Sequence, residues 1–124
     1  GATLAGHVHI GNWVIMGGLT AAHQFCHIAD HSFIGGGAII LADVPPFIMV
    51  GNNGEPRGIN SEGLKRRGFS SETIMQIKRA YKILYRNNYR ATEAVEKLRE
   101  LSDDTQDVKR MADFVNRSSR GIVR

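Results

Sequence analysis

The sequence predicts a parallel β-helix of hexapeptide repeats over the first 50 residues and a small α-helical domain after it. Every sixth residue from Leu4 to Ile40 is apolar, and the residue four places further along is always small or β-branched. After residue 70 the apolar residues change to the 3–4 spacing of amphipathic helices. A period of six with two restricted positions is typical of stacked β-helical coils.

The two restricted positions define the expected core of the coils. The aliphatic position is occupied by Leu4, Ile10, Met16, Ala22, Ile28, Ile34 and Ile40, and the compact position by Val8, Val14, Thr20, Cys26, Ser32, Ala38 and Val44. Three hexads give a coil of 18 residues, so each strand is expected about 4.8 Å from its equivalent in the next coil. The expected stacked pairs are Ile28 on Ile10, Ile34 on Met16, and Ile40 on Ala22.

Glycines and prolines mark the expected corners and the end of the coils. Glycine often follows the aliphatic position, as at Gly11, Gly17 and Gly35, where its tolerance of unusual backbone angles favours a sharp turn. The paired prolines after Val44 remove two ladder donors, so the β-helix is expected to end there. The chain opens in mid-pattern at Gly1, which predicts further coils upstream.

The remaining residues are expected to form a loop and a helical domain. Residues 51–59 are rich in Gly, Asn and Pro and predict a loop. Helices are expected at about 60–67, capped by Asn60, and at 71–87, 91–102 and 105–118, the second of them capped by Ser70 or Ser71. The predicted organisation is therefore a β-helix over 1–50, a loop over 51–59 and an antiparallel helical domain over 60–124.

Charge is divided unevenly along the chain. All sixteen Lys and Arg residues lie at or after Arg57, and residues 57–90 carry a net charge of +7 from nine basic and two acidic residues. Such a segment attracts an acidic protein, a phosphate ligand or an acidic membrane surface. Aromatic residues are not interleaved with the basic ones to stack on bases, so no nucleic-acid partner is expected.

Cysteine content and hydropathy indicate the compartment. The single cysteine, Cys26, falls on a core position and allows no disulfide within one chain, which favours a reducing compartment. No run of 18 apolar residues is present, so no membrane span is expected. The predicted localisation is cytoplasmic.

All five histidines fall outside the inward positions, at His7, His9, His23, His27 and His31. Together with Trp13 and Phe25 they indicate a surface that a neighbouring subunit covers, hence a trimer with ligand clefts between chains. His7 and His9 are expected on one side of a strand and His9 to stack on His27, so three histidines shared between subunits give an alternative zinc site.

Two further segments carry candidate binding residues. Gly18 and Gly36 are 18 residues apart, and their missing side chains leave room for an extended apolar ligand. The segment from Asn60 to Gly68 combines an amide, the Glu62 carboxylate and the forked guanidinium groups of Arg66 and Arg67, which suit a base edge and phosphates.

These features together resemble one known family. The hexads, the stretch Thr20–Cys26, Asp43-Val-Pro-Pro46 and Asn60-Ser-Glu-Gly-Leu-Lys-Arg-Arg-Gly-Phe69 are similar to the C-terminal half of the UDP-N-acetylglucosamine 3-O-acyltransferases. The resemblance implies a left-handed parallel β-helix, a homotrimer and no cofactor or metal. It also implies transfer of an (R)-3-hydroxyacyl chain from acyl carrier protein to the sugar 3-hydroxyl of UDP-N-acetylglucosamine, the first step of lipid A biosynthesis.

The resemblance also assigns roles to individual residues. Gly6 matches the glycine whose backbone N–H stabilises the thioester oxyanion. His7, His23 and Gln24 match residues that line the substrate cleft, and Gly36 matches the position that limits acyl length. Asn60, Glu62, Arg66 and Arg67 match residues that hold the uridine and phosphates or dock the carrier protein.

One family feature is absent from the sequence. The general base of the family is a histidine in a His-x-x-His-Asp motif one coil before Gly6, and no such motif occurs in these 124 residues. The chain alone is therefore expected to be inactive or nearly so. The alternatives are a non-catalytic trimeric scaffold or binding fragment and a zinc carbonic anhydrase on the same type of β-helix.

Overall fold

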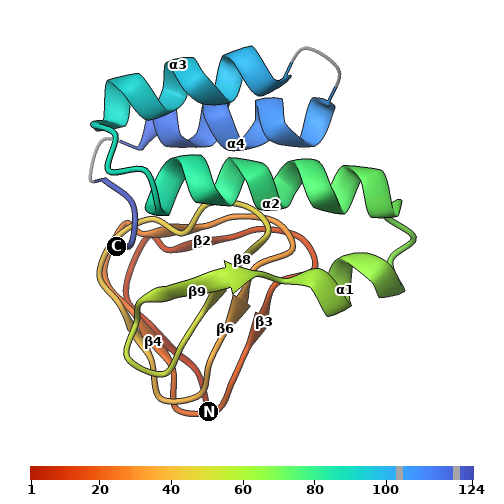
Figure 1. The fold of residues 1–124 in the computed structure, drawn as a ribbon. Helices are drawn as coiled ribbons and strands as arrows, with labels where there is room; N and C mark the ends of the chain where they lie inside the picture. Colours follow the sequence, from red (N-terminus) through yellow and green to blue (C-terminus); the bar gives the residue numbers. More distant parts are fainter. Residues whose placement is uncertain (103–104, 119–120) are drawn as a thin grey trace. The chain divides into compact units, whose positions relative to one another are not determined.

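The computed structural model describes residues 1–102, 105–118 and 121–124. The chain divides into two compact units (Figure 1). One contains residues 1–60 together with residues 121–124, and the other contains residues 61–102 and 105–118. Each unit is described by itself.

The first unit is a parallel β-helix made of short strands that alternate with corners (Figure 1). The strands are β1 (Thr3–Leu4), β2 (His9–Ile10), β3 (Ile15–Met16), β4 (Ala21–Ala22), β5 (His27–Ile28), β6 (Phe33–Ile34), β7 (Ile39–Ile40), β8 (Ile48–Val50) and β9 (Pro56–Ile59). They form three sheets, ordered β1-β4-β7, β2-β5 and β3-β6-β8-β9. All pairs are parallel except β8 with β9, which is antiparallel.

The predicted core stacking is confirmed. Ile28 pairs with Ile10, Ile34 with Met16, and Ile40 with Ala22, each at the expected register. The side chains of Ile28, Ile34 and Ile40 are fully or almost fully buried. Burial of such aliphatic side chains, about 1.5–3 kcal/mol each, is the main stabilising contribution to the coils.

The prediction for the glycines was wrong in its physical reason. The left-handed corner residues are non-glycine at five successive hexads, namely His7, Trp13, Leu19, Phe25 and His31, and the sixth is Gly37. The glycines that follow the aliphatic position serve instead where neighbouring coils approach closely. A Cβ added to Gly11 would lie 2.7 Å from the backbone nitrogen of Asp30, and one added to Gly17 would lie 2.6 Å from that of Gly36.

The coils also continue past the point where the prolines were expected to end them. Val44 pairs with Ile28, so it occupies the aliphatic position and not the compact position assigned from the sequence. The third coil has lost two residues before Val44, and β8 then pairs with β6 through Ile34 and Val50. The prolines lie in the corner between Val44 and β8, where no ladder donor is needed.

Two segments belong to the first unit in a way that composition did not predict. Within the expected loop 51–59, the residues of β9 form an antiparallel strand on β8, where a turn over residues 51–54 reverses the chain. The expected helical domain 60–124 does not include its last residues: Ile122 forms a parallel bridge with Asp43. Ile122 and Val123 are buried there.

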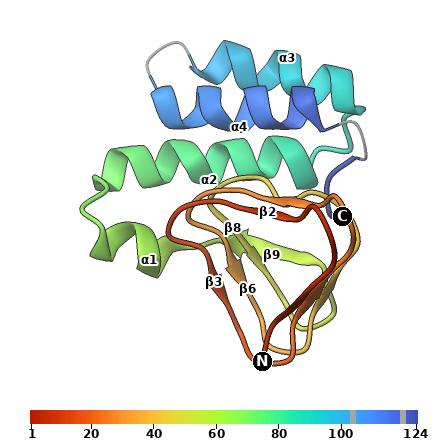
Figure 2. The ribbon, with the colours of Figure 1, turned by 180° about the vertical axis from the view of Figure 1, so that it is seen from behind.

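The second unit contains four helices among the described residues: α1 (Ser61–Arg66), α2 (Ser71–Tyr85), α3 (Ala91–Leu101) and α4 (Gln106–Arg117). α3 runs antiparallel to α2 and α4 (Figures 1 and 2). Ser70 caps α2 by accepting a hydrogen bond from the Thr73 N–H, as one of the two expected caps does. No helix in the described parts of the chain is long and apolar enough to cross a membrane.

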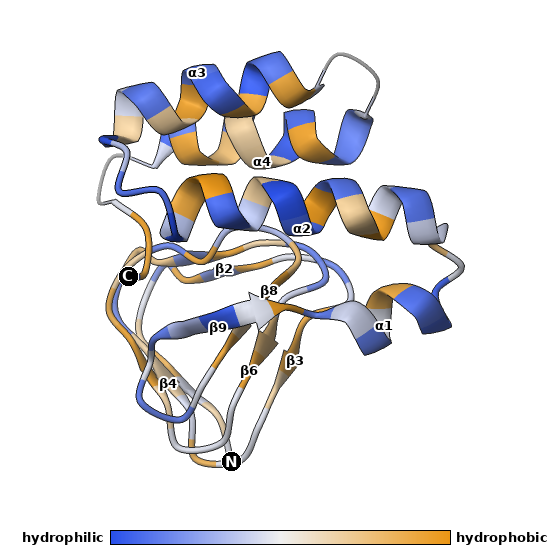
Figure 3. Ribbon diagram, in the orientation of Figure 1, coloured by the Kyte–Doolittle hydropathy of each residue, from blue (hydrophilic) through white to orange (hydrophobic). Residues whose placement is uncertain are grey.

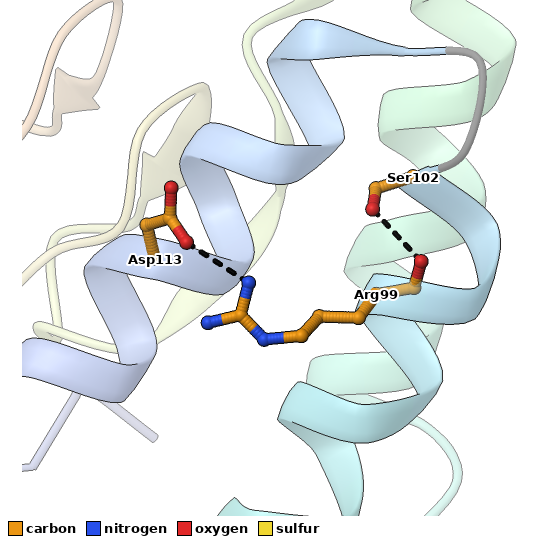
Figure 4. Close-up of polar contacts among 3 residues, drawn as sticks. All are labelled: Arg99, Ser102 and Asp113. Carbon is orange, nitrogen blue, oxygen red and sulfur yellow. Dashed lines mark hydrogen bonds and ion pairs between the residues drawn. The ribbon is translucent and has the colours of Figure 1, made fainter.

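Apolar faces hold these helices together. Hydrophobic and hydrophilic segments alternate along α2, α3 and α4 (Figure 3). The buried side chains include the expected Ile77, Tyr81, Leu84, Val95, Leu98, Val108, Met111 and Val115. On the surface, the Arg99 guanidinium of α3 lies 3.0 Å from the Asp113 carboxylate of α4 (Figure 4).

Candidate functional site

One corner of the β-helix gathers four of the predicted site residues. Gly6 and His7 form this corner in the first coil, between β1 and β2, and His23 and Gln24 form it in the second, between β4 and β5. The Phe25 N–H donates to the Gly6 carbonyl oxygen at 3.3 Å, which joins the two levels. All five residues are exposed. We call residues 5–7 and 23–25 the site corner.

Side-chain stacking extends along this corner. The His7 and Phe25 rings lie 5.0 Å apart, centroid to centroid, and within 10° of parallel. Both residues have the left-handed backbone conformation, so both side chains project from equivalent points of successive coils. Phe25 was assigned only to the covered surface in the sequence analysis, although its spacing of 18 from His7 indicates this stacking.

Gly6 presents an unoccupied backbone donor. Its carbonyl oxygen is used, but its N–H donates to no group within the described residues. A Cβ added at Gly6 would meet nothing within 4 Å, and its φ lies outside the left-handed region. A free N–H facing open space beside histidine side chains is able to hydrogen-bond a developing negative charge.

An apolar hollow lies at the level of the third coil on the same side. Its volume is about 240 Å³, and it is lined on the β-helix by Ile39, Leu41 and Ala42 and on the C-terminal segment by Ile122 and Val123. Ile39 and Leu41 are 61% and 65% exposed, which is high for side chains of this size. The hollow can therefore accept a hydrocarbon group.

Gly36 lies at a different corner from Gly6. It follows β6 and stacks on Gly18 of the preceding coil, where a Cβ on Gly36 would lie 3.3 Å from the Gly18 carbonyl oxygen. The Asn52 side-chain amide donates to the Gly36 carbonyl oxygen. Within one chain, the predicted acyl-length residue and the predicted oxyanion donor are thus on separate corners.

Asn60 is used inside the first unit. Its side-chain amide donates to the His31 carbonyl oxygen at 3.0 Å, its backbone N–H donates to the Phe47 carbonyl oxygen at 2.8 Å, and it is 6% exposed. The side chain therefore fixes the end of β9. The sequence motif did not distinguish this role from ligand binding.

The other predicted polar residues lie on or directly after α1 in the second unit. Glu62 and Arg66 are exposed and one helical turn apart, and Arg67 follows the last residue of the helix. On α2 the basic residues Lys78 and Lys82 and the following Arg86 are exposed, as expected. The positive charge of segment 57–90 is therefore available to a partner.

The remaining histidines correct the zinc hypothesis. His9 and His27 stack at 4.6 Å as expected, but His7 lies at a corner and does not share the strand of His9. His31 is buried and not exposed, because its ring stacks between Trp13 at 6.5 Å and Phe47 at 5.7 Å. The described residues contain no group of three His, Cys, Asp or Glu side chains able to hold a metal ion.

Sequence comparison relates the chain to enzymes of one kind. A family model described as UDP-N-acetylglucosamine O-acyltransferase, domain 2, matches residues 43–123. Acyl-[acyl-carrier-protein]–UDP-N-acetylglucosamine O-acyltransferases from Stenotrophomonas maltophilia and Burkholderia mallei are 53% and 48% identical over 98% and 99% of this chain. The chain spans about half the length of these curated relatives, 47% and 49%.

Solved structures agree with the sequence relatives. The UDP-N-acetylglucosamine acyltransferase of Francisella novicida matches all of this chain and 46% of its own at 42% identity, with a TM-score of 0.95. The Arabidopsis enzyme of the same name matches 99% of this chain and 46% of its own at 33% identity, with a TM-score of 0.86. The shared fold is a left-handed β-helix followed by helices.

Proposed function

Because the chain belongs to the UDP-N-acetylglucosamine O-acyltransferase family, we propose that it forms the acyl and nucleotide-sugar cleft of such an enzyme. The proposed reaction transfers an (R)-3-hydroxyacyl chain from acyl carrier protein to the 3-hydroxyl of UDP-N-acetylglucosamine, the first step of lipid A biosynthesis. The site corner carries this proposal, since it places the free Gly6 N–H beside His7, His23 and Gln24 on successive coils.

In the proposed reaction the sugar hydroxyl attacks the thioester carbonyl. A new ester C–O bond forms, the C–S bond breaks, and the proton of the hydroxyl is finally carried by the thiol of the carrier protein. The Gly6 N–H is suited to stabilise the oxyanion formed during attack, because it has no other partner among the described residues. The general base is proposed to be a histidine outside these 124 residues.

We further propose that copies of the chain form a homotrimer whose clefts combine two different corners. One copy contributes the site corner, and the next contributes Gly36, which limits acyl length. Exposed apolar side chains flank both corners, with Leu19 81%, Ile39 61% and Ile15 46% exposed. Contact between copies removes this apolar area from water.

The second unit is proposed to hold the charged parts of the substrates. Arg66, Arg67 and Glu62 suit the uridine, its phosphates or the carrier protein, while the buried hydrogen bond of Asn60 supports a role in setting the start of α1. The exposed basic residues of α2 suit acidic acyl carrier protein. These partners place the proposed reaction in the cytoplasm.

Binding and turnover are tested separately. We expect the 124-residue polypeptide to bind UDP-N-acetylglucosamine by calorimetry but to transfer (R)-3-hydroxyacyl groups at least about a hundredfold more slowly than a full-length relative, because a missing general base costs about 10²–10⁴ in rate. Gly6→Ala places a methyl group in the cleft without strain and is expected to weaken binding. Transfer at the rate of a full-length relative contradicts the assignment of the base, and unchanged binding in Gly6→Ala contradicts the site.

One observation favours a second candidate function, a trimeric binding scaffold. The sequence contains no His-x-x-His-Asp motif. Addition of imidazole, which replaces missing histidine side chains in some enzymes, distinguishes the two: recovery of transfer supports the enzyme, and binding with no recoverable transfer supports the scaffold. The family match argues against the carbonic anhydrase alternative.

A further inference from the structure

The contraction in the third coil removes a hydrogen-bond acceptor below the site corner. Ala22 pairs with Ile40, 18 residues later, whereas Ile28 pairs with Val44, only 16 residues later. The missing residues therefore fall between Ile40 and Val44. This stretch lies directly opposite the turn from His23 to His27.

A carboxylate supplies the missing acceptor. In the first coil, the N–H of His9 donates to the backbone carbonyl of Cys26 at 3.0 Å. The equivalent donor of the second coil, the N–H of His27, donates at 2.9 Å to Oδ1 of Asp43. Asp43 is 4% exposed, so this charge-assisted bond is shielded from water.

The C-terminal segment in turn fixes Asp43. The Asp43 N–H donates to the Gly121 carbonyl oxygen at 3.1 Å, and the Asp43 carbonyl oxygen accepts from the Val123 N–H at 2.8 Å. The bridge with Ile122 is parallel, as a fourth coil would be. Both backbone groups of Asp43 are therefore committed, and its carboxylate is held at one place.

We propose that Asp43 is a positioning residue for His23 and Gln24, an inference that rests on the proposed function. The turn that carries them is joined to the third coil at its two ends, by the His23 N–H on the Ile40 carbonyl at 2.7 Å and by the His27 N–H on Asp43. Loss of the second bond leaves the turn attached to that coil at one end only. The exposed side chains of His23 and Gln24 then lose their fixed orientation.

A matched control exists at another corner. Asp30 uses Oδ1 in the same manner, accepting from the Asn12 N–H of the preceding coil at 2.7 Å. That corner carries none of the predicted cleft residues. Asp30→Ala therefore removes a similar bond between coils without affecting the site corner directly.

The experiment compares Asp43→Ala, Asp43→Asn and Asp30→Ala in the 124-residue chain. Amide hydrogen exchange at His27, the NMR signals of His23 and Gln24, and the dissociation constant for UDP-N-acetylglucosamine are measured. For Asp43→Ala we expect about tenfold faster exchange at His27, shifted His23 and Gln24 signals and about tenfold weaker binding, because a charge-assisted bond is lost. Asparagine keeps an acceptor oxygen, so it is expected to restore much of both properties.

Asp30→Ala is expected to lower stability but to leave the His23 and Gln24 signals and the dissociation constant within about twofold of the parent, since it acts at a different corner. Unchanged His23 and Gln24 signals in Asp43→Ala overturn the proposal, and so does equal weakening of binding by both alanine variants. If Asp43→Ala does not fold, Asp43→Asn decides: faster exchange at His27 but not at Asn12 supports the proposal, and no change overturns it. If the parent chain binds no UDP-N-acetylglucosamine, the proposed function fails, while the exchange and NMR results still decide the role of Asp43.

Discussion

The substitution Gly17→Ala tests how closely the coils approach one another. Its Cβ would lie 2.6 Å from the Gly36 nitrogen and 2.7 Å from the Gly36 Cα, both rigid backbone atoms of the next coil. Ordinary contact requires at least 3.4 Å, so the coils must separate locally by about 0.7–0.8 Å at positions where interior packing leaves no free space.

The cost follows from the hydrogen bonds beside this contact. The Gly17 N–H donates to Ile34 at 2.8 Å and the Gly37 N–H to Gly18 at 2.9 Å, and the separation takes both bonds beyond hydrogen-bond distance. Two backbone bonds contribute about 0.5–1.5 kcal/mol each, so the free energy of unfolding is expected to fall by about 1–3 kcal/mol.

The neighbouring glycine gives the control. A Cβ at Gly18 meets nothing within 4 Å and its backbone is not left-handed, so Gly18→Ala is expected to be neutral or slightly stabilising. Urea unfolding is followed by the fluorescence of Trp13, the only tryptophan, which reports the β-helical unit. If Gly17→Ala destabilises the protein no more than Gly18→Ala, the inferred coil contact is wrong.

Three further predictions concern the helices and the acyl chain. Ser70→Ala is expected to destabilise the protein by about 1 kcal/mol through loss of the α2 cap, whereas Thr105→Ala, at an N-cap position without a side-chain cap bond, changes it by less; equal effects in chemical unfolding contradict this. The Arg99–Asp113 ion pair (Figure 4) is partly exposed, so a double-mutant cycle is expected to give about 0.2–1 kcal/mol, and a coupling above 2 kcal/mol refutes a surface pair. Gly36→Val, tested in an active full-length context, is expected to favour shorter acyl donors, and an unchanged chain-length preference in competition assays rejects its proposed role.

The stacking of the coils followed from the sequence because a period of six has one structural solution. The spacing of 18 also predicts that Gly6 lies opposite Gln24 and His7 opposite Phe25, so the site corner is implicit in the repeat. Handedness came from resemblance alone, since parallel crossovers are normally right-handed and the periodicity is the same for either hand.

The missed features are those that break the repeat. Two residues lost before Val44 shift the frame, and no local propensity marks a deletion inside an apolar run. The return of Ile122 to Asp43 is a long-range pairing, which sequence patterns of neighbouring residues do not record. The burial of His31 depends on Phe47 and Trp13 stacking from adjacent coils, one of which lies beyond the shifted frame.

Chemical-shift mapping with UDP-N-acetylglucosamine tests most directly whether the site corner is a substrate site. On titration of the labelled chain, we expect saturable shifts in the backbone amides of Gly6 and His7 and in the side-chain signals of His23 and Gln24. The amide of Asn12, at another corner, is expected to stay unchanged. Saturable shifts that spare the site corner, or no shifts at millimolar nucleotide sugar, would contradict the account.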